Sequence, residues 1–449
     1  MLTTRHAAAW LAGTWLVFVA AVYLPDVGRG FVRDDFGFIE AGRAALTNPA
    51  QGLLPQHPGF YRPLVTATFS VDYQLHGLHA RGYGFSNLLL YVACAAAIGL
   101  LARRIGLTAR AAILAAFVWS VNPHGINMAL VWLSGRTALC LTLFSVLTAI
   151  AVLERRFVWA ALGLAAALAS KEEAVLLPLV LIVWATERRD WRLYACLAVP
   201  VGLYFFARSQ TAAFVPGSAP SFYQFTFSPV AVFRNILEYA DRSATASCVV
   251  VVLAAVFYRM YPRIDHRRSR MLVACACWVA AGYALTIFLP VRSSLYAVFP
   301  SVGAAIAAAT LVESMRDPLA DARAERVPFE VMLAASLLLL LSSYRARNDR
   351  WVEPARFSQR TLDRIEAAAR AWPSNGTIIL RDEVDPRASF ASAFGTFATE
   401  AVRLRTGRAF DVWIDPPPSG WLLAGMAPPD NSRVIARFST HNGTIVQTQ

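Results

Sequence analysis

The chain has 449 residues, of which 57% are hydrophobic and 16% charged, and its formal net charge is +13. Soluble domains carry roughly 25% charged residues, so this composition excludes an ordinary soluble protein and indicates a polytopic membrane protein. We do not expect a nucleic-acid partner, because no basic and aromatic residues alternate on a soluble face. All six cysteines fall within apolar runs, so neither a disulfide framework nor a cysteine metal site is indicated.

Apolar segments recur along most of the chain, and a membrane-spanning helix needs about 20 such residues. The sequence predicts an all-α membrane domain over residues 1–345 and a small extracytoplasmic α/β domain over residues 346–449. The first segment follows Arg5, and we interpret it as an anchor because further segments follow it. The eleven expected spans are 7–24, 84–102, 111–121, 129–153, 157–169, 174–186, 193–207, 243–258, 271–290, 297–312 and 329–343.

Arginine is concentrated in alternate loops. The loops on one side carry 16 arginines in short stretches, whereas the long loop 25–83 on the other side carries five over 59 residues. Cytoplasmic loops have an excess of Lys and Arg. We therefore expect a cytoplasmic (inner) membrane protein with a cytoplasmic amino terminus. The arginine-rich loops are 103–110, 154–156, 187–192, 259–270 and 313–328.

The first outer loop contains two adjacent carboxylates, Asp34 and Asp35, between Phe31 and Phe36. Neighbouring carboxylates repel and burial adds a desolvation cost, so one of them is a candidate base near neutral pH. The alternative is a pair that caps a helix beginning near Phe36. Later in the loop, the stretch 64–75 predicts a helix that lies in the membrane interface.

Polar residues of five separated stretches are all expected on the outer side, each at or just inside the end of a helix. One such group alone is typical of a cap or a snorkelling side chain, but ionisable residues at this depth commonly line a cavity or pathway. Five on one side favour a shared site. They are Asp34-Asp35, Tyr61-Arg62-Pro63, His124 with Ser134-Gly135-Arg136, Ser170-Lys171-Glu172, and Arg292 with Tyr296.

Lys171 is the only lysine among the 42 Lys and Arg residues, and it lies with Glu172 between the apolar runs 157–169 and 174–186. An ammonium is a compact point charge, whereas a guanidinium is a planar fork, so the two are not interchangeable. Coding bias with one surviving lysine is the alternative. We expect Lys171 to be held by Glu172.

These residues also form an ordered set of motifs. The set resembles the membrane region, about residues 10–345 here, of the transmembrane and tetratricopeptide-repeat O-mannosyltransferases and their bacterial relatives, which are GT-C glycosyltransferases. No 34-residue repeat is present, so the tetratricopeptide array is missing. The motifs are Phe31-Val32-Arg33-Asp34-Asp35, Tyr61-Arg62-Pro63-Leu64, Trp132-Leu133-Ser134-Gly135-Arg136, Ser170-Lys171-Glu172 and Arg292-Ser293-Ser294-Leu295-Tyr296, then Pro300-Ser301-Val302-Gly303.

The resemblance implies a hexosyltransferase that moves a sugar, with mannose as one option, from a polyprenyl phosphate to a hydroxyl on a protein, lipid or glycan. It implies inversion at the anomeric carbon, with Asp34 or Asp35 as the base and Asp34 slightly favoured. No cofactor or metal is expected. Arginine and lysine are natural partners of the donor phosphate. The phosphate candidates are Lys171, Arg62, Arg136 and Arg292, with Tyr61, His124, Glu172 and Tyr296 in support.

The chain also departs from the relatives' pattern. The segment 122–128 lacks the acid of their His-Pro…Glu arrangement, and the segment 82–87 lacks the histidine of their Gly-Tyr-His-x-x-Asn. These departures leave open an inactive relative that scaffolds other proteins. A transporter or flippase of lipid-linked sugars is a further alternative, although it predicts internal repeats that we do not find.

The last hundred residues alternate helical and strand patterns. Apolar residues at helical spacing predict an amphipathic helix, and short β-branched runs predict strands. Asn442-Gly443 is typical of a hairpin turn. We expect helices at 357–371 and 389–404, and strands at 376–381, 410–414, 434–438 and 444–446.

Overall fold

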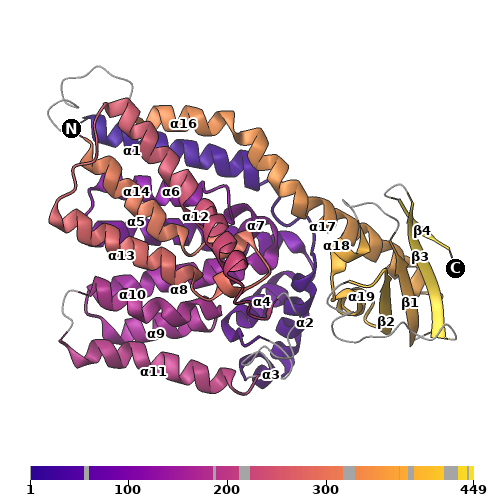
Figure 1. Ribbon diagram of the computed structural model, residues 1–449. Coiled ribbons are helices and arrows are strands. Elements are labelled where there is room, and N and C mark those ends of the chain that lie inside the picture. The colour runs from indigo at the N-terminus through magenta and orange to yellow at the C-terminus, as the bar shows by residue number, and fades with distance from the viewer. Residues whose placement is uncertain are drawn as a thin grey trace.

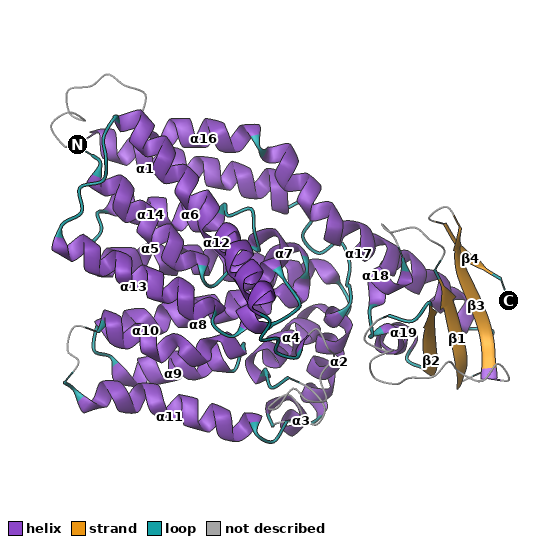
Figure 2. Ribbon diagram, in the orientation of Figure 1, coloured by secondary structure: helices purple, strands orange, loops and turns teal. Residues whose placement is uncertain are grey.

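The computed structural model of the chain describes residues 2–54, 60–185, 189–211, 223–316, 329–373, 375–382, 389–418, 433–441 and 444–448. Most of the helices lie side by side in one bundle, and a small sheet stands at one end of it (Figures 1 and 2). The helices are α1 (Leu2–Phe18), α2 (Asp34–Thr47), α3 (Pro49–Leu53), α4 (Pro63–His76), α5 (Ala80–Arg104), α6 (Ala109–Ser120), α7 (Ile126–Val131), α8 (Arg136–Leu153), α9 (Phe157–Leu168), α10 (Leu177–Trp184), α11 (Trp191–Arg208), α12 (Pro229–Tyr258), α13 (His266–Tyr283), α14 (Ser301–Ser314), α16 (Phe329–Leu339) and α17 (Leu341–Ala369).

The predicted spans coincide with helices, but their ends and continuity differ in places. The segment 129–153 is not one helix, because α7 ends at Val131 and a short 3-10 turn, η2 (Leu133–Gly135), precedes α8. A side chain at Gly135 would approach the Ala129 backbone to 2.6 Å, so the chain folds back closely at this turn. In contrast, α12 begins at Pro229 instead of residue 243.

Within the described residues, three helical segments are long and apolar enough to cross a membrane: α5, the segment 133–153 and α12. The helices α16 and α17 form a fourth if their bend of 48° belongs to one span. The expected number of eleven spans therefore stays a prediction. A membrane location agrees with α12, which exposes Phe233, Val252 and other apolar side chains along its length.

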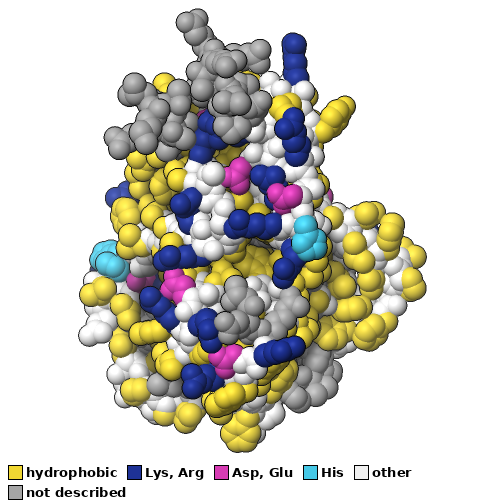
Figure 3. Space-filling view, turned by 90° about the vertical axis from the view of Figure 1, so that its left-hand side faces the viewer, with side chains coloured by type: hydrophobic (Ala, Val, Ile, Leu, Met, Phe, Trp, Pro, Cys, Tyr) yellow, Lys and Arg dark blue, Asp and Glu magenta, His cyan; other side chains and the backbone are white. Residues whose placement is uncertain are grey.

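The arginine-rich loops described by the structure meet at one end of the bundle. Arg104 pairs with Glu154 at 2.8 Å, Arg155 pairs with Asp190 at 3.3 Å, and Arg267 lies against Gly106. This end is on the left of Figure 1, and Figure 3 shows many Lys and Arg side chains spread over that face. These three contacts bring together four of the loops that the sequence places on one side, while their cytoplasmic orientation stays a prediction.

The strands confirm the predicted α/β character of the chain's last part. They are β1 (Asn375–Arg381), β2 (Ala409–Asp415), β3 (Val434–His441) and β4 (Thr444–Gln447), in the sheet order β2-β1-β3-β4. β1 pairs in parallel with β2 and β3, and β3 pairs antiparallel with β4, as the hairpin prediction requires. The turn residues 442–443 themselves lie outside the described residues.

The predicted helix at 389–404 is two helices, α18 (Phe390–Phe394) and α19 (Ala398–Thr406). Gly395 separates them with a φ of 53°, a left-handed conformation that favours glycine. The capping box between Ser389 and Ser392 fixes the start of α18.

The sheet domain and the loop 25–83 share one hydrophobic core. Buried Phe36 of α2 and Phe69 of α4 belong to the same cluster as Phe394 of α18 and Ile378 of β1. The rings of Phe36 and Phe394 are 5.8 Å apart. α17 runs unbroken from the bundle into this core (Figure 1). The sheet domain is thus positioned to hold the loop that carries the two aspartates.

Candidate active site

Asp35 is the buried member of the aspartate pair. Its carboxylate accepts hydrogen bonds from the backbone N–H of Val32 at 2.9 Å, from the backbone N–H of Ser134 at 2.7 Å and from the Ser134 hydroxyl. Burial raises the pKa of Asp35 to about 7, although these three donors favour the charged form. Asp35 thus ties the start of α2 to η2. The N-cap of α2 is Arg33, which makes no side-chain cap hydrogen bond, so the aspartate pair does not cap the helix as the alternative predicted.

Asp34, one residue earlier, has a different environment. Its side chain is half-buried, and within the described part of the chain its own backbone N–H is the hydrogen-bond donor found for the carboxylate. Burial raises the pKa of Asp34, while the charges of Arg62 and Arg33 lower it. A carboxylate with a raised pKa and unused acceptor positions is suited to take a proton from a ligand.

Arg33 holds this turn in an unusual backbone conformation. Its φ is 49° and its ψ is −120°, a region that non-glycine residues rarely adopt. The Arg33 N–H donates to the Ala393 carbonyl at 2.8 Å, and its Nε donates to the Ser392 carbonyl at 2.9 Å. The sheet domain therefore fixes the residue directly before Asp34 through hydrogen bonds as well as through the shared core.

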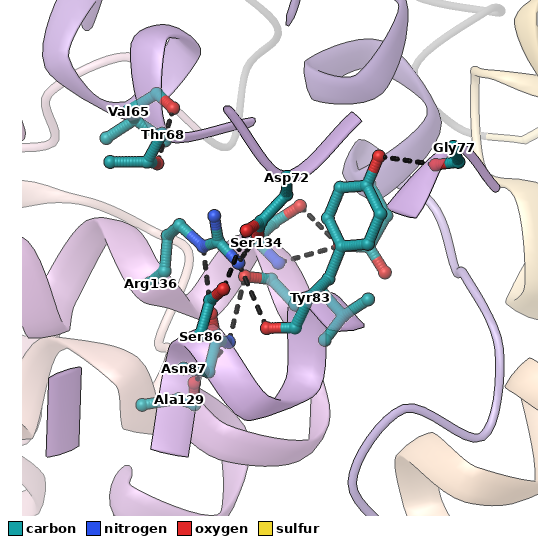
Figure 4. Close-up of polar contacts among 12 residues, drawn as sticks. Val65, Thr68, Asp72, Gly77, Tyr83, Ser86, Asn87, Ala129, Ser134 and Arg136 are labelled. Carbon is teal, nitrogen blue, oxygen red and sulfur yellow. Dashed lines mark hydrogen bonds and ion pairs between the residues drawn. The ribbon is translucent and has the colours of Figure 1, made fainter. Parts of the chain in front are cut away.

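Arg136 is almost completely buried and is surrounded by protein partners (Figure 4). It pairs with Asp72 at 2.5 Å, donates from Nε to Asn87 at 2.8 Å and donates to the Tyr83 carbonyl at 3.0 Å. Its guanidinium also lies 4.5 Å from the centre of the Phe69 ring. These contacts brace α4, α5 and α8 against one another, so we leave Arg136 out of the donor site proposed below.

Arg62 and Glu172 form an ion pair between the loop 25–83 and the chain after α9. The Arg62 guanidinium donates to both Glu172 oxygens, at 2.9 and 3.1 Å. Burial would raise the pKa of Glu172, but Arg62, Arg208 and Lys171 outweigh it and hold that pKa at about 2. The Arg62 Nε is buried and has no hydrogen-bond partner among the described residues. One donor of this fork is thus available to a ligand.

Lys171 pairs with Glu173 instead of Glu172, which corrects the sequence-based expectation. The Lys171 Nζ lies 2.6 Å from a Glu173 oxygen, and both side chains are only 4% exposed. Lys171 has an extended backbone and the 3-10 helix η3 starts at Glu172, so the two glutamates point to different cations. The Lys171 Nζ also lies 4.5 Å from the centre of the Tyr296 ring. The second Glu173 oxygen is buried without a hydrogen-bond partner among the described residues.

Aromatic side chains surround these ion pairs. The Tyr61 and Tyr204 rings are 6.3 Å apart, and Phe60 lies 5.5 Å from Tyr223. Burial raises the pKa of Tyr223, and the charge of Asp34 raises it further, so Tyr223 is close to both the aspartate and the arginine pair. Sequence reasoning missed Tyr223, because a single tyrosine between spans carries no motif.

Two predicted residues lie in neighbouring clusters instead of beside Asp34. His124 faces Asp241 of α12 at 4.0 Å, and burial, together with the charge of Arg347, lowers its pKa. Arg292 pairs with Glu238, which also accepts from Arg234 and Arg242. The ring of Tyr239 connects this basic cluster to Tyr296 at 6.3 Å between ring centres.

The structure can be compared with known proteins at this point. No protein-family profile and no curated protein matches the sequence. The crystal structure of ArnT from Cupriavidus metallidurans bound to undecaprenyl phosphate matches with a TM-score of 0.55 and 15% identity, over 96% of this chain and 90% of ArnT. The same protein in the apo state matches with a TM-score of 0.54 and 14% identity, over 98% and 94%.

A second kind of protein also matches. The oligosaccharyltransferase AglB from Archaeoglobus fulgidus, in complex with an inhibitory peptide and a dolichol-phosphate, has a TM-score of 0.50 and 10% identity, over 98% of this chain and 70% of AglB. Both ArnT and AglB are GT-C glycosyltransferases. The chain has the GT-C fold. Identities of this size show the fold alone, so the chemistry is argued from the residues of this chain.

In this GT-C fold, three contacts involve all five predicted stretches: Asp35 meets Ser134, Arg62 meets Glu172, and Lys171 meets Tyr296. The charge of Arg62 also acts on Asp34. No group of three or more His, Cys, Asp or Glu residues among the described residues is placed to hold a metal ion. A metal-free reaction stays a prediction. The arrangement provides one half-buried carboxylate, Asp34, and two buried cations, Arg62 and Lys171. The Arg62 Nε and a Glu173 oxygen beside Lys171 have no hydrogen-bond partner among the described residues.

Proposed function

We propose that the chain is a GT-C glycosyltransferase that moves a sugar from a polyprenyl-phosphate donor to an acceptor hydroxyl, with Asp34 as the general base. The observation that carries this proposal is the combination of a half-buried Asp34 with the Arg62 and Lys171 pairs, where an Arg62 donor has no partner among the described residues. The polyprenyl phosphate bound to ArnT supports the class of donor, since that protein shares this fold.

The reaction is a single displacement at the anomeric carbon. Asp34 takes the proton of the acceptor hydroxyl as its oxygen forms the new bond to that carbon. The bond between the anomeric carbon and the phosphate oxygen breaks, and its electron pair leaves with the polyprenyl phosphate. Attack and departure on opposite faces invert the configuration. General-base assistance of this kind contributes roughly 10²–10⁴-fold to the rate.

The cations act on the leaving group. The Arg62 Nε–H is the first candidate to donate to the phosphate, since its Nη2 is held by Glu172. Lys171 adds a point charge that Glu173 and the Tyr296 ring keep in place. In a buried site these fixed charges stabilise the developing phosphate charge more than in water. We place Arg292 with Glu238 in a neighbouring basic cluster that faces the same lipid phosphate or its head group.

The orientation in the membrane is part of the proposal. The arginine-rich end of the bundle is assigned to the cytoplasm by the excess of arginine in its loops. The aspartate loop and the sheet domain are then on the outer face of the cytoplasmic membrane. Because the tetratricopeptide array of the relatives is missing, we leave protein, lipid and glycan acceptors open.

The test is transfer by the purified protein in liposomes, from labelled polyprenyl-phosphate mannose and from other polyprenyl-phosphate hexoses. The proposal predicts one polyprenyl phosphate released for each glycosylated product by the wild type, and release slower by about 10²–10⁴-fold by Asp34→Asn. An intact donor that only changes leaflet would indicate a flippase. A folded wild type that neither cleaves nor moves any donor would support the scaffold alternative and contradict the proposal.

A further inference from the structure

A polar cavity lies where the bundle meets the sheet domain. Its volume is about 200 Å³, and its walls come from the residue before Asp34, from the start of α7, from α17 and from α18. Arg33, Arg347 and Arg350 line it, together with Asn127, Trp351 and Ser392. The cavity is smaller than the 300–1,000 Å³ typical of pockets for drug-sized ligands, so it suits one small chemical group.

The charge of this cavity is not balanced by its own walls. None of its lining residues is acidic, and no ion pair joins Arg33, Arg347 or Arg350 to a carboxylate within the described part of the chain. The Arg33 Nε donates to the Ser392 carbonyl, and this bond orients the guanidinium. Its two terminal nitrogens are left to face a ligand. Three guanidinium groups around one small cavity match the oxygens of a phosphate or a carboxylate.

The walls are held in place by aromatic contacts. Trp351 of α17 stacks on Trp132 with their ring centres 4.9 Å apart and an angle of 7° between planes. The Arg33 guanidinium lies 5.8 Å from the centre of the Trp351 ring. Asn127 donates to the Arg347 carbonyl at 3.4 Å, which ties α7 to α17. The arginines are therefore presented by elements that pack against one another, as a preorganised site requires.

The position of the cavity suggests which ligand it serves. Arg33 directly precedes the proposed base Asp34, whereas the proposed donor cations Arg62 and Lys171 are outside the lining. The strained φ of Arg33 also supports a functional role for this cavity, because residues with strained backbone conformations are concentrated at functional sites. A ligand that contacts Arg33 is adjacent to the base on the side of the sheet domain.

We propose that this cavity binds an anionic group, a phosphate or a carboxylate, carried by the acceptor. The assignment to the acceptor rests on the proposed transfer reaction, and the anion site itself rests on the cavity. The acceptor class is thus an acidic or phosphorylated molecule with a free hydroxyl. Binding there would place that hydroxyl near Asp34, while the donor phosphate remains with Arg62 and Lys171.

The test compares two double variants on the same helix. Arg347→Gln/Arg350→Gln removes two cavity charges, and Arg356→Gln/Arg360→Gln removes two exposed charges of α17 that are outside the lining. Calorimetric titration with inorganic phosphate, glucuronate and neutral methyl mannoside measures binding to each protein. We expect the two anions to bind the wild type and the control pair alike. They should bind the cavity pair at least about tenfold more weakly. Methyl mannoside should bind none of the proteins.

Three results would overturn the proposal: anion binding that is unchanged in the cavity pair, binding that falls equally in the control pair, or no anion binding to the wild type. If the cavity pair fails to fold, the exposed Arg350→Gln variant alone must still weaken anion binding. The lipid source of phosphate is tested with a short polyprenyl phosphate, which the cavity pair should bind as the wild type does. Asp34→Asn should keep anion binding, so failure of the proposed transfer and failure of this site are distinguishable.

Discussion

Two buried clusters in this bundle each pair cations with carboxylates, and they differ in whether the cation donors are used within the protein. Arg136 is enclosed by Asp72, Asn87 and the Tyr83 carbonyl, and its donors are used within the protein. The Arg62 and Lys171 pairs instead leave a cation donor, the Arg62 Nε, and a Glu173 oxygen buried without hydrogen-bond partners among the described residues. In the Arg136 cluster the atom without a hydrogen bond is an Asp72 oxygen, and that oxygen is in the ion pair with Arg136. Buried polar atoms are nearly always satisfied, so unsatisfied ones suggest a missing ligand. The first cluster is a brace, and the second is a candidate site.

The largest expected effect concerns the brace. Arg136→Gln leaves the buried Asp72 carboxylate without its partner, and breaking such a pair costs about 3–5 kcal/mol of stability. Thermal unfolding of the purified protein in detergent measures the shift, and the double variant Asp72→Asn/Arg136→Gln should recover part of it. If Arg136→Gln keeps its stability but needs more donor, Arg136 binds the phosphate as the sequence suggested and the comparison fails.

A smaller loss of stability is expected at Asp35. Asp35→Ala leaves the Val32 N–H, the Ser134 N–H and the Ser134 hydroxyl without their acceptor, at about 1–3 kcal/mol. Asp35→Asn keeps one acceptor oxygen and should lose less. The unfolding temperatures of the two variants, measured side by side, check this order. Equal stability of Asp35→Ala and the wild type would show that Asp35 does not anchor the loop.

Lys171→Arg tests whether the site needs a compact charge. Lys171 is buried against Glu173 and the Tyr296 ring, so the larger planar guanidinium does not fit the same contacts. We expect kcat/KM for the donor to fall about tenfold, equivalent to about 1.4 kcal/mol. Arg43→Lys, in the partly exposed pair with Glu40, is the matched control and should change little. Unchanged donor use by Lys171→Arg would return the single lysine to coding bias.

The smallest effect is a shift of the pH profile. Asp34 must lose its proton to act as a base, so the rate should rise with pH through its pKa, which burial raises and Arg62 lowers. Removing the positive charge in Arg62→Gln raises that pKa further and moves the acid limb to higher pH. The normalised pH–rate profile separates this shift from any loss of rate. The assignment of Asp34 as the base would be contradicted if the acid limb of the profile does not move in Arg62→Gln, or if it moves equally in Arg43→Gln.

The sequence predicted much of the fold because its signals are local. The apolar runs coincide with helices, and the strands β1 to β4 lie where β-branched runs and the Asn442-Gly443 pair indicate them. It failed where the backbone conformation of one residue decides the outcome. The break at Trp132 contains no proline to announce it, and the extended backbone of Lys171 selects Glu173 over Glu172 as its partner.

Only those residues of the candidate site that belong to local sequence motifs were predicted. Motifs drew attention to Asp34, Arg62 and Lys171, each at the end of a helix. Tyr223 and Arg347 were missed, because their proximity to the aspartate loop depends on tertiary packing of distant segments and no motif marks them. The union of the sheet domain with the loop 25–83 in one core has no sequence signal either.

The central claim is a division of labour in which Asp34 takes the proton and Asp35 holds the loop. The most direct test measures transfer from labelled polyprenyl-phosphate mannose, or the donor found active, by Asp34→Asn and Asp35→Asn, each with its unfolding temperature. We predict that Asp34→Asn unfolds like the wild type and loses transfer by about 10²–10⁴-fold, whereas Asp35→Asn is less stable and keeps measurable transfer. Full transfer by a folded Asp34→Asn, or its loss only in a stable Asp35→Asn, would contradict the account.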